Sequence, residues 1–293
     1  MSDWPAIAAA ISQATGRRFE FAAHVPTSGG YINRTLRIEG KDGRNFFLKL
    51  NEVQQYPVLR SEVAGIETIA ATSTLRVPCI ITHGTTDAHS YLVLEYLELQ
   101  PRGDASKLGE QLASMHRHTS ARFGFEHDNH IGATRQPNAW MDDWIAFFRE
   151  RRLGFQLQLA REKNLGGRLI TLEDRLLEAL PRFFVDHQPA PSLLHGDLWG
   201  GKHAYLADGT PVIFDPAVYY GDRECDLAMT ELFGGFSRDF YTAYRASFPL
   251  DVGYPMRRDL YNLYHILNHA NMFGGSYVRQ SEQMMQKLLA SAG

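Results

Sequence analysis

Two aspartates within residues 192–216 carry the strongest chemical signal in the sequence. Asp197 closes the triplet HGD, and Asp215 follows eighteen residues later in the apolar run VIFDPA. Paired carboxylates can divide the work of phosphoryl transfer, since one accepts the proton of a substrate hydroxyl while the other holds the Mg²⁺ that neutralises phosphate charge. We therefore predict that Asp197 is the catalytic base and Asp215 the metal ligand. Taken singly, either aspartate reads more simply as a turn or cap residue.

Lys49 lies within the run FFLKL, which has the pattern of a buried strand. A lysine in such a run needs a charged partner, because an unpaired ammonium is costly to bury. Glu62 supplies one on the following helical segment, beside the apolar positions Val63 and Ile66. We predict that Glu62 pairs with Lys49 and that Lys49 binds nucleotide phosphates. The alternative is a strand-edge lysine whose amine lies in water.

Two backbone segments have the composition of a nucleotide site. The string SGGYIN, from Ser28 to Asn33, joins two predicted strands, and its glycine pair lets the backbone approach phosphate oxygens closely, although most such turns are plain hairpins. The string EYL ends the last predicted strand at a change of composition, where backbone groups of a hinge could bind adenine. With Lys49, the predicted nucleotide-binding residues are Ser28, Gly29, Gly30, Glu95, Tyr96 and Leu97.

The first hundred residues predict a mostly antiparallel sheet with one inserted helix. Runs of strand-forming residues bounded by turn residues lie at 18–25, 31–38, 46–50, 77–84 and 91–97. Between the third and fourth runs, apolar residues recur at helical spacing over 57–72, and Pro57 suits a helix start. A short N-terminal helix is also expected, since Ile7 and Ile11 recur at helical intervals rather than in the continuous apolar block of a signal peptide.

Beyond residue 98 the pattern becomes helical. The helical segments are 108–118, 139–164, 172–184 and most of the chain from about 223. Residues 192–216 are the exception, because two strand-like runs there flank loops rich in Gly and Asp. The order of glycine turn, strand lysine, helix glutamate, hinge and two aspartates is that of a bilobal kinase. We therefore predict an α+β, protein-kinase-like fold, with an N-lobe of antiparallel sheet plus helix over 1–98 and a mainly helical C-lobe over 99–293.

The bulk composition excludes several kinds of partner. The 293 residues carry a formal net charge of -3 with no run of like charges, which argues against nucleic acid or an anionic membrane. No apolar stretch approaches the roughly 20 residues that span a bilayer. Cys79 and Cys225 are too few for a disulfide framework or a thiolate metal site, and we expect both to be buried small residues. We expect a cytoplasmic protein, as a monomer or a homodimer.

Long strings between about residues 27 and 277 carry a family resemblance. They are SGGYIN, FFLKLN, LVLEYL, FGFEHDNHIG, QPNAWMDDWIAFFRERRLGFQL, LLHGDLWGGK, FDPAVYYGDRECDLAM and LYHILNHANMFGGSY. With these strings the chain resembles the fructosamine, or ketosamine, kinase family. HGDLW and GDRECDLAM are more specific than HGD alone, which the wider superfamily of aminoglycoside and choline phosphotransferases shares.

The resemblance implies a reaction and a set of roles. The reaction is transfer of the ATP γ-phosphate to the 3-hydroxyl of a ketosamine, a sugar adduct of an amine or protein, with ATP and Mg²⁺ as cofactors. The 3-phosphate then leaves by elimination, so phosphorylation marks the adduct for removal. The roles implied for Asp197, Asp215, Lys49 and Glu62 agree with those argued above.

Further residues receive roles only through the resemblance. Trp199 is implied to stack against the sugar-amine substrate, which suits an aromatic platform; the alternative is a loop residue packed on the surface. Helix residues implied to line the sugar pocket are His265, Asn268 and His269. Asp222 and Asp226 are implied to brace the catalytic loop.

The chain departs from the family pattern at two positions. The family has asparagine, a second metal ligand, five residues after the catalytic aspartate, and this chain has Lys202 there. An ammonium cannot coordinate Mg²⁺, so we expect nucleotide binding with reduced turnover. Tyr31 replaces a cysteine that forms an intermolecular disulfide in several family members, and we expect that redox switch to be absent.

Two alternative functions stay open at this point. An aminoglycoside- or choline-type phosphotransferase would share HGD and the later aspartate but not HGDLW with GDRECDLAM. A nucleotide-binding pseudokinase is suggested by Lys202, whereas retention of the charged set around Lys49 and Asp197 argues against it. A substrate panel distinguishes the first alternative, and binding without turnover would indicate the second.

Overall fold

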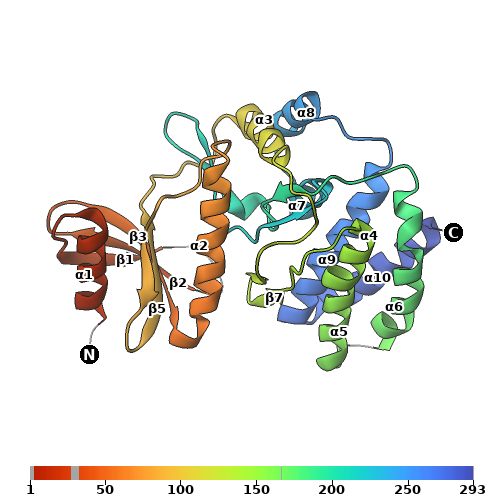
Figure 1. Cartoon of the computed structure of the whole chain (residues 1–293), viewed down its shortest axis with the longest axis horizontal. Coiled ribbons are helices and arrows are strands. Elements are labelled where there is room, and N and C mark those ends of the chain that lie inside the picture. Colours follow the sequence, from red (N-terminus) through yellow and green to blue (C-terminus); the bar gives the residue numbers. More distant parts are fainter. Residues whose placement is uncertain (1–2, 28–32, 166, 293) are drawn as a thin grey trace. The chain divides into compact units, whose positions relative to one another are not determined.

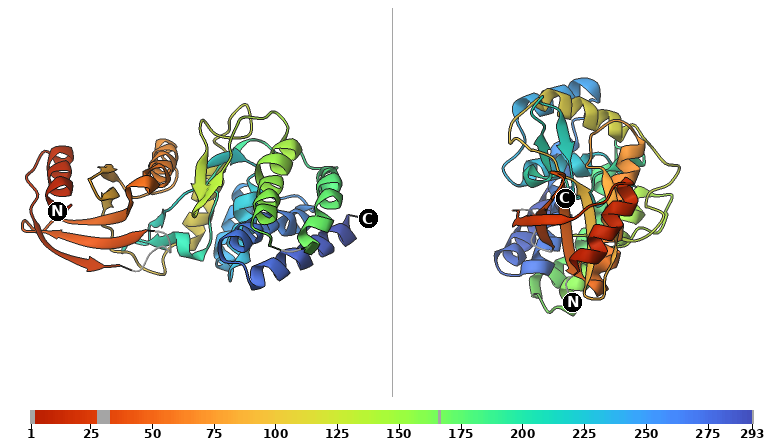
Figure 2. Two further views of the ribbon diagram at one scale, coloured as in Figure 1. Left: turned by 90° about the horizontal axis from the view of Figure 1, so that it is seen from below. Right: turned by 90° about the vertical axis from the view of Figure 1, so that its left-hand side faces the viewer.

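The structure is a computed structural model that describes residues 3–27, 33–165 and 167–292. The chain forms two compact units, one of residues 1–104 with 204–216 and one of residues 105–203 with 217–293. Figures 1 and 2 show their helices and strands. The predicted glycine turn, Ser28, Gly29 and Gly30, and the departure at Tyr31 lie outside the described residues. The lobe boundary at 98 and 99 stays a prediction.

The first unit contains a five-stranded antiparallel sheet in the order β1-β2-β3-β5-β4. Its strands are β1 (Phe21–Pro26), β2 (Arg34–Gly40), β3 (Asn45–Glu52), β4 (Ile80–Thr85) and β5 (His89–Glu95). Each lies within a few residues of its predicted position, because strand-forming runs between turn residues are a strong local signal.

Side-chain alternation gives this sheet two different faces. One face is apolar and packs against helix α1 (Trp4–Thr15), the predicted N-terminal helix. The buried cluster there includes Ile7, Ile11, Leu36, Ile38, Leu48 and Val93. Because successive strand residues point to opposite faces, Lys49 points to the other face, toward helix α2 (Tyr56–Ala71). The two helices thus flank the sheet (Figure 1).

Residues 204–216 complete the first unit. They contain most of a two-stranded sheet of β9 (His203–Tyr205) and β10 (Pro211–Ile213). The amide of Gln100 donates to the carbonyl of Tyr205 at 2.7 Å, and the amide of Ile213 donates to the carbonyl of Arg76 at 3.0 Å. These bonds anchor the segment that leads into Asp215. A short 3₁₀ turn, η1 (Val53–Gln55), precedes α2.

The second unit is mainly helical, as predicted. Its α-helices are α3 (Ala105–His116), α4 (Trp144–Phe147), α5 (Phe155–Glu162), α6 (Gly167–Ala179), α7 (Glu224–Leu232), α8 (Arg238–Ser247), α9 (Tyr254–Phe273) and α10 (Ser276–Ser291). The other elements are a π-helix, η2 (Phe148–Gly154), 3₁₀ turns η3 (Leu180–Phe184) and η4 (Gly200–Lys202), and strand pairs β6 (Asn129–Ile131) with β7 (Thr134–Gln136) and β8 (Ser192–Leu194) with β11 (Tyr219–Gly221). Within the described part of the chain, every helix is too short or too polar to cross a membrane.

The single helix predicted over 139–164 is wrong. The helix begins only at Trp144, where the Asp143 side chain caps it by accepting from the amide of Ala146 at 2.7 Å. Residues before the cap form a bridge instead, in which Phe123 and Met141 exchange backbone hydrogen bonds of 2.9 Å. Seven residues in the middle, 148–154, adopt a π-helix rather than an α-helix, a wider turn that apolar periodicity does not reveal.

The prediction that both cysteines are buried is also wrong. Cys225 is buried in α7, but Cys79 is exposed. The reason is that β4 begins only at Ile80. Cys79 therefore lies in the connecting segment, where the Arg76 guanidinium contacts its sulfur at 3.6 Å.

Helices α3 and α8 cross at Gly109, and this crossing gives a stability prediction. A Cβ added there would lie 2.4 Å from the carbonyl oxygen of Phe240 and 3.0 Å from the amide of Tyr244. We expect Gly109→Ala to lower the free energy of unfolding by about 1–3 kcal/mol in urea denaturation, because backbone must move apart. As a control, an added Cβ meets nothing at Gly167 in α6, so Gly167→Ala should be neutral or slightly stabilising. Equal effects of both substitutions would contradict the close crossing.

Candidate functional site

The ammonium of Lys49 is held by two carboxylates. Its Nζ donates to Glu62 Oε1 at 2.6 Å and also contacts Asp215 Oδ1. The Lys49 side chain is only 6% exposed, and β3, α2 and the segment after β10 bring the three residues together in the first unit. The predicted pairing of Lys49 with Glu62 is present, whereas the direct contact with Asp215 was not expected.

The charges around Lys49 keep it protonated. Burial by itself would lower the pKa of Lys49, but the charges and hydrogen bonds of Asp215 and Glu62 outweigh it and raise the pKa above its ordinary value. Asp215 has a backbone φ of 56°, in the left-handed region that few non-glycine residues adopt. Strained residues of this kind cluster at functional sites. The cluster therefore presents a fixed cation beside two acidic groups.

The side chain of Asp226 in α7 holds the HGD loop in place by hydrogen bonds. Its Oδ2 accepts from the amide of His195 at 2.7 Å, and its Oδ1 accepts from the amide of Gly196 at 2.8 Å. Burial tends to raise the pKa of Asp226, but the hydrogen bonds from His116 and from the amide of Gly196 help to lower it below its ordinary value. The carboxylate is therefore ionised, and the bracing role implied for Asp226 agrees with the structure.

Gly196 permits a close contact behind Asp197. Its φ is 83°, and an added Cβ would lie 2.1 Å from the carbonyl oxygen of Ala217. The amide of Ala217 donates to the carbonyl of His195 at 2.8 Å. Since Ala217 follows Asp215 by two residues, this bond ties the chain after the second aspartate to the loop that carries the first.

Asp222, implied to brace the same loop, has other partners. Its carboxylate accepts from Tyr261 Oη at 2.5 Å, from the amide of Glu224 at 3.0 Å and from His187 Nε2 at 2.7 Å. These bonds fix the start of α7 against α9 and the segment after η3. Through these contacts Asp222 supports α7 rather than the HGD loop.

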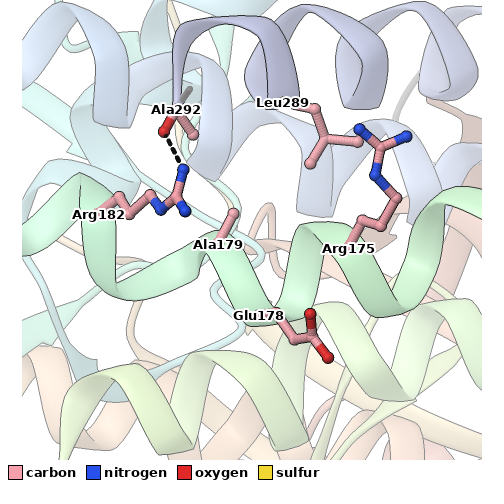
Figure 3. Close-up of a pocket in the computed structure, with 6 residues that line it drawn as sticks. All are labelled: Arg175, Glu178, Ala179, Arg182, Leu289 and Ala292. Carbon is pink, nitrogen blue, oxygen red and sulfur yellow. Dashed lines mark hydrogen bonds between the residues drawn. The ribbon is translucent and has the colours of Figure 1, made fainter.

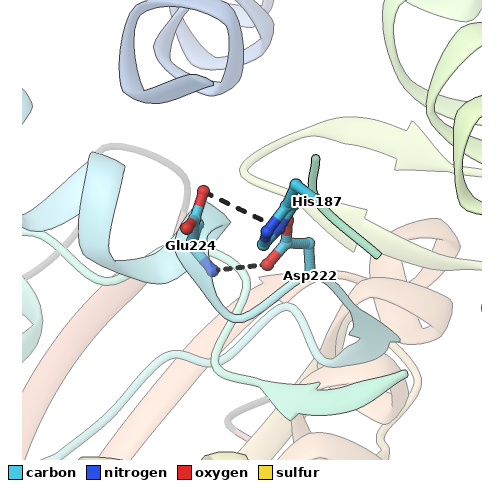
Figure 4. Close-up of side chains that lie close together, drawn as sticks. All are labelled: His187, Asp222 and Glu224. Atoms are coloured by element: carbon cyan, nitrogen blue, oxygen red, sulfur yellow. Dashed lines mark hydrogen bonds and ion pairs between the residues drawn. The ribbon is translucent and has the colours of Figure 1, made fainter. Parts of the chain in front are cut away.

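His187, Asp222 and Glu224 lie close enough to hold a metal ion (Figure 4). Their other contacts indicate an ion-pair network instead. Arg257 donates to both oxygens of Glu224, at 2.7 and 3.0 Å, and His187 Nδ1 pairs with Asp251 at 2.7 Å. A cation in this cluster would have to displace a guanidinium, so we do not assign a metal here.

The predicted substrate residues divide into two groups. Trp199 and His269 are linked by the ring of Phe233, whose centroid lies 6.1 Å from that of Trp199 and 5.2 Å from that of His269. Asn268 instead lies in the buried interior, where its Oδ1 accepts from Gln156 at 3.3 Å. His265 is also buried, and burial lowers its pKa to about 3, so it is neutral.

Gly201 explains the position of the Trp199 ring. An added Cβ at Gly201 would lie 2.3 Å from the indole, so the ring folds over this glycine. The amide of Lys202 donates to the carbonyl of Trp199 at 2.8 Å, which closes the η4 turn. Lys202, which stands where a metal-ligand asparagine was expected, is thus held in a defined 3₁₀ turn.

Sequence reasoning missed a buried cation near the loop. Arg152 of η2 is fully buried, and its guanidinium lies 3.9 Å from the centre of the Tyr219 ring. It donates to the carbonyl of Pro137 at 2.7 Å and to Asn138 Oδ1 at 2.8 Å. An arginine in a helical segment is expected to lie in water, so no local sequence signal predicts that Arg152 is buried.

An amide network continues from this cation to the chain after Asp215. Asn138 donates to Asn129 Oδ1 at 2.9 Å, and Gln136 donates to the carbonyl of Ala217 at 3.0 Å. Tyr264 donates to Gln136 Oε1 at 2.8 Å. Burial, opposed by Arg152 and aided by the charge of Asp197, raises the pKa of Tyr264 to about 12. Residues of the strings FGFEHDNHIG and QPNAW thus support the chain at Ala217, which in turn is bonded to His195 of the HGD loop.

The three residues of the predicted adenine-binding hinge lie at the end of β5 and directly after it. Glu95 ends β5, with Tyr96 and Leu97 directly after it, and its carboxylate accepts from Arg76 and from the amide of Cys79.

A cavity of about 280 Å³ involves η3, α6 and α10 and contains none of the predicted site residues (Figure 3). Its lining is Arg175, Glu178, Ala179, Arg182, Leu289 and Ala292.

Comparison with known proteins decides the family. The sequence matches the family model described as fructosamine kinase over residues 3–291. This chain belongs to the fructosamine kinase family. A relative from Synechocystis named "Probable ketoamine kinase" is 47% identical over 292 residues, which cover 98% of this chain and 97% of the relative.

Solved structures agree with the family and with the predicted fold. A "Putative fructosamine-3-kinase" from Haemophilus somnus superposes with a TM-score of 0.89 at 30% identity, covering 98% of this chain and 97% of the other. A macrolide 2'-phosphotransferase of type I superposes with a TM-score of 0.59 at 13% identity, covering 97% and 96%, which is a likeness of fold alone. The predicted α+β, protein-kinase-like fold of this fructosamine kinase family member is confirmed.

The His187 network predicts a pH dependence of stability. Burial opposes its protonation, but Asp222 and Glu224 outweigh it and raise the pKa of His187 above the ordinary 6.5. A histidine whose pKa is higher in the folded than in the unfolded protein stabilises the fold fully below pH 6.5. That stabilisation is lost as the pH rises through the folded-state pKa. We expect the free energy of unfolding in urea to fall as pH rises above 6.5, and to fall less steeply in His187→Gln. His118→Gln, at an exposed histidine, is the control; an unchanged slope in His187→Gln would refute the network's role.

Proposed function

We propose that this protein is a ketosamine kinase that transfers the γ-phosphoryl group of ATP to the 3-hydroxyl of a sugar-amine adduct. The products are ADP and the 3-phosphate of the adduct, whose later elimination frees the amine. The reaction is thus a deglycation step. We also propose a cytoplasmic location, with free Cys79 and Cys225 as support.

The observation that carries the proposal is the buried Lys49 ammonium between Glu62 and Asp215. A protonated lysine in a dry setting is costly unless anionic groups balance it. The same fixed charge is suited to phosphate oxygens, and its glutamate partner prevents it from swinging away. Phosphoryl transfer relies on such positioning and charge stabilisation more than on covalent chemistry.

Asp197 is proposed to take the proton of the acceptor hydroxyl. As the hydroxyl oxygen attacks the γ-phosphorus, its O–H bond breaks and the proton passes to the carboxylate, while the bond to the ADP oxygen breaks. The loop is positioned for this by Asp226, which holds the two amides before Asp197. Removal of Asp197 would leave the scaffold intact and the proton without an acceptor.

Mg²⁺ fits the donor set at Asp215. A carboxylate oxygen is a ligand that Mg²⁺ prefers, and the Asp215 side chain is 27% exposed, so an ion and its waters can reach it. When bound, the ion neutralises charge on the phosphates. Lys202 differs from the family's second ligand and supplies a point charge instead of an oxygen.

The substrate class follows from the family and from the aromatic residue after the catalytic loop. The Synechocystis relative is named "Probable ketoamine kinase", and the Haemophilus structure "Putative fructosamine-3-kinase". Trp199, two residues after Asp197, offers a ring face to a cyclic sugar or a cationic amine. We take these together as support for a ketosamine acceptor rather than an aminoglycoside.

The first prediction of this proposal concerns Asp197. With ATP, Mg²⁺ and ribuloselysine or fructoselysine, the protein should release ADP, and Asp197→Ala should lower kcat by at least about 100-fold because the base is lost. Coupled detection of ADP provides the measurement. Asp186→Ala, at an exposed aspartate of the same unit, should retain full activity. Persistent turnover in Asp197→Ala would reject the assignment.

The second prediction concerns Lys202. We expect Lys202→Asn to raise kcat by about tenfold, since an amide oxygen can bind Mg²⁺ where an ammonium cannot. Calorimetric titration should show that ATP binds both proteins. If the wild-type protein turns over as fast as Lys202→Asn, the prediction that Lys202 lowers kcat is wrong. Binding without turnover in both proteins would favour the pseudokinase alternative.

A further inference from the structure

An aromatic strip extends beyond Trp199 along the second unit. From Phe233 at the end of α7, the ring contacts continue to His269, whose centroid lies 5.7 Å from Phe273 and 5.1 Å from Tyr277. Phe273 and Tyr277 contact each other at 6.2 Å. We define the aromatic strip as Trp199, Phe233, His269, Phe273 and Tyr277.

Two local features build the outer end of this strip. His269 and Phe273 are four residues apart on α9 and therefore lie on one face of the helix. Gly274 and Gly275 then have φ values of 65° and 61°, and the amide of Gly274 closes α9 by donating to the carbonyl of Ala270 at 2.8 Å. The chain reverses there into α10, which returns Tyr277 to the ring of His269.

The strip is partly accessible and carries no positive charge. Phe273 is 54% exposed, an unusual state for a phenylalanine, and the other four members are partly buried. Burial lowers the pKa of His269 and so favours the neutral imidazole, outweighing the opposing effect of the hydrogen bond that its Nδ1 donates to the backbone carbonyl of His265 at 2.8 Å. The rings of the strip thus present apolar and quadrupolar faces.

We propose that the aromatic strip binds the amine portion of the ketosamine and favours adducts whose amine carries an apolar stem, as a lysine side chain does. This inference rests on the proposed function. It assigns a binding surface to the amine portion of the substrate, whereas the proposed function assigns only Trp199 to the sugar-amine adduct. Phe273 and Tyr277 are the specificity-determining residues in it.

The chemistry of the adduct fits such a strip. The linking nitrogen of a ketosamine is a secondary ammonium at neutral pH, which aromatic faces attract. The four methylenes of a lysine stem gain from leaving water against the rings. Because Phe273 is exposed at the outer end, a stem can continue past the strip, so a lysine within a peptide is accepted as well as a free amine.

The test compares two ribulose adducts that differ only in the amine. One adduct is formed on methylamine, and the other on the ε-amine of Nα-acetyl-lysine methylamide. The measured quantity is the ratio of kcat/KM for the lysine adduct to kcat/KM for the methylamine adduct. We expect a wild-type ratio of about ten or more, and a fall of about three- to tenfold in Phe273→Ala and in Tyr277→Ala through a higher KM for the lysine adduct.

Two controls and two outcomes make the result decisive. Phe273→Tyr keeps a ring and should keep most of the ratio, whereas Val252→Ala removes a fully exposed apolar side chain outside the strip and should leave the ratio unchanged. A ratio that neither alanine variant changes overturns the inference, while wild-type turnover of either adduct still upholds the proposed function. If the wild-type protein phosphorylates neither adduct, both the proposed function and this inference fail.

Discussion

The first unit depends on one buried charge, the ammonium of Lys49. Its two carboxylate partners come from α2 and from the segment after β10, so a single cation joins three parts of the chain. Removing one partner from a buried ion pair typically costs about 3–5 kcal/mol, because the other charge stays in a poorly solvating setting. The sheet alternation that points Leu48 to the apolar core is the same alternation that points Lys49 to these acids.

The second unit holds its HGD loop by hydrogen bonds from the interior, centred on the buried Asp226 carboxylate, which also pairs with His116. Asp226 satisfies two consecutive amides before Asp197, and Gln136 holds the carbonyl of Ala217 on the returning chain. Buried polar groups of this kind are stabilising only when all partners are present. The loop is thus positioned from the interior of the unit, whereas Trp199, two residues after Asp197, stays partly exposed.

Prediction from sequence succeeded where the signal is local and failed where it is not. The strands of the first sheet, helix α2 and the pairing of Lys49 with Glu62 follow from periodicity and from the cost of an unpaired charge. The π-helical turn and the exposure of Cys79 do not, because apolar periodicity does not distinguish a π-turn from an α-turn, and the exposure depends on where a strand begins. The functional roles of the site residues stay predictions that the assays address.

By itself, the sequence determined the family, the α+β class and which residues of each unit have chemically useful types. Long matching strings and short-range periodicity contain that information. Only the tertiary structure decided that Asp215 contacts Lys49 from 166 residues away, that Phe233 links Trp199 to His269, and that Arg152 is buried against Tyr219. These contacts join segments far apart in the chain, and their partners are selected by packing of whole elements, which no local pattern of residues specifies.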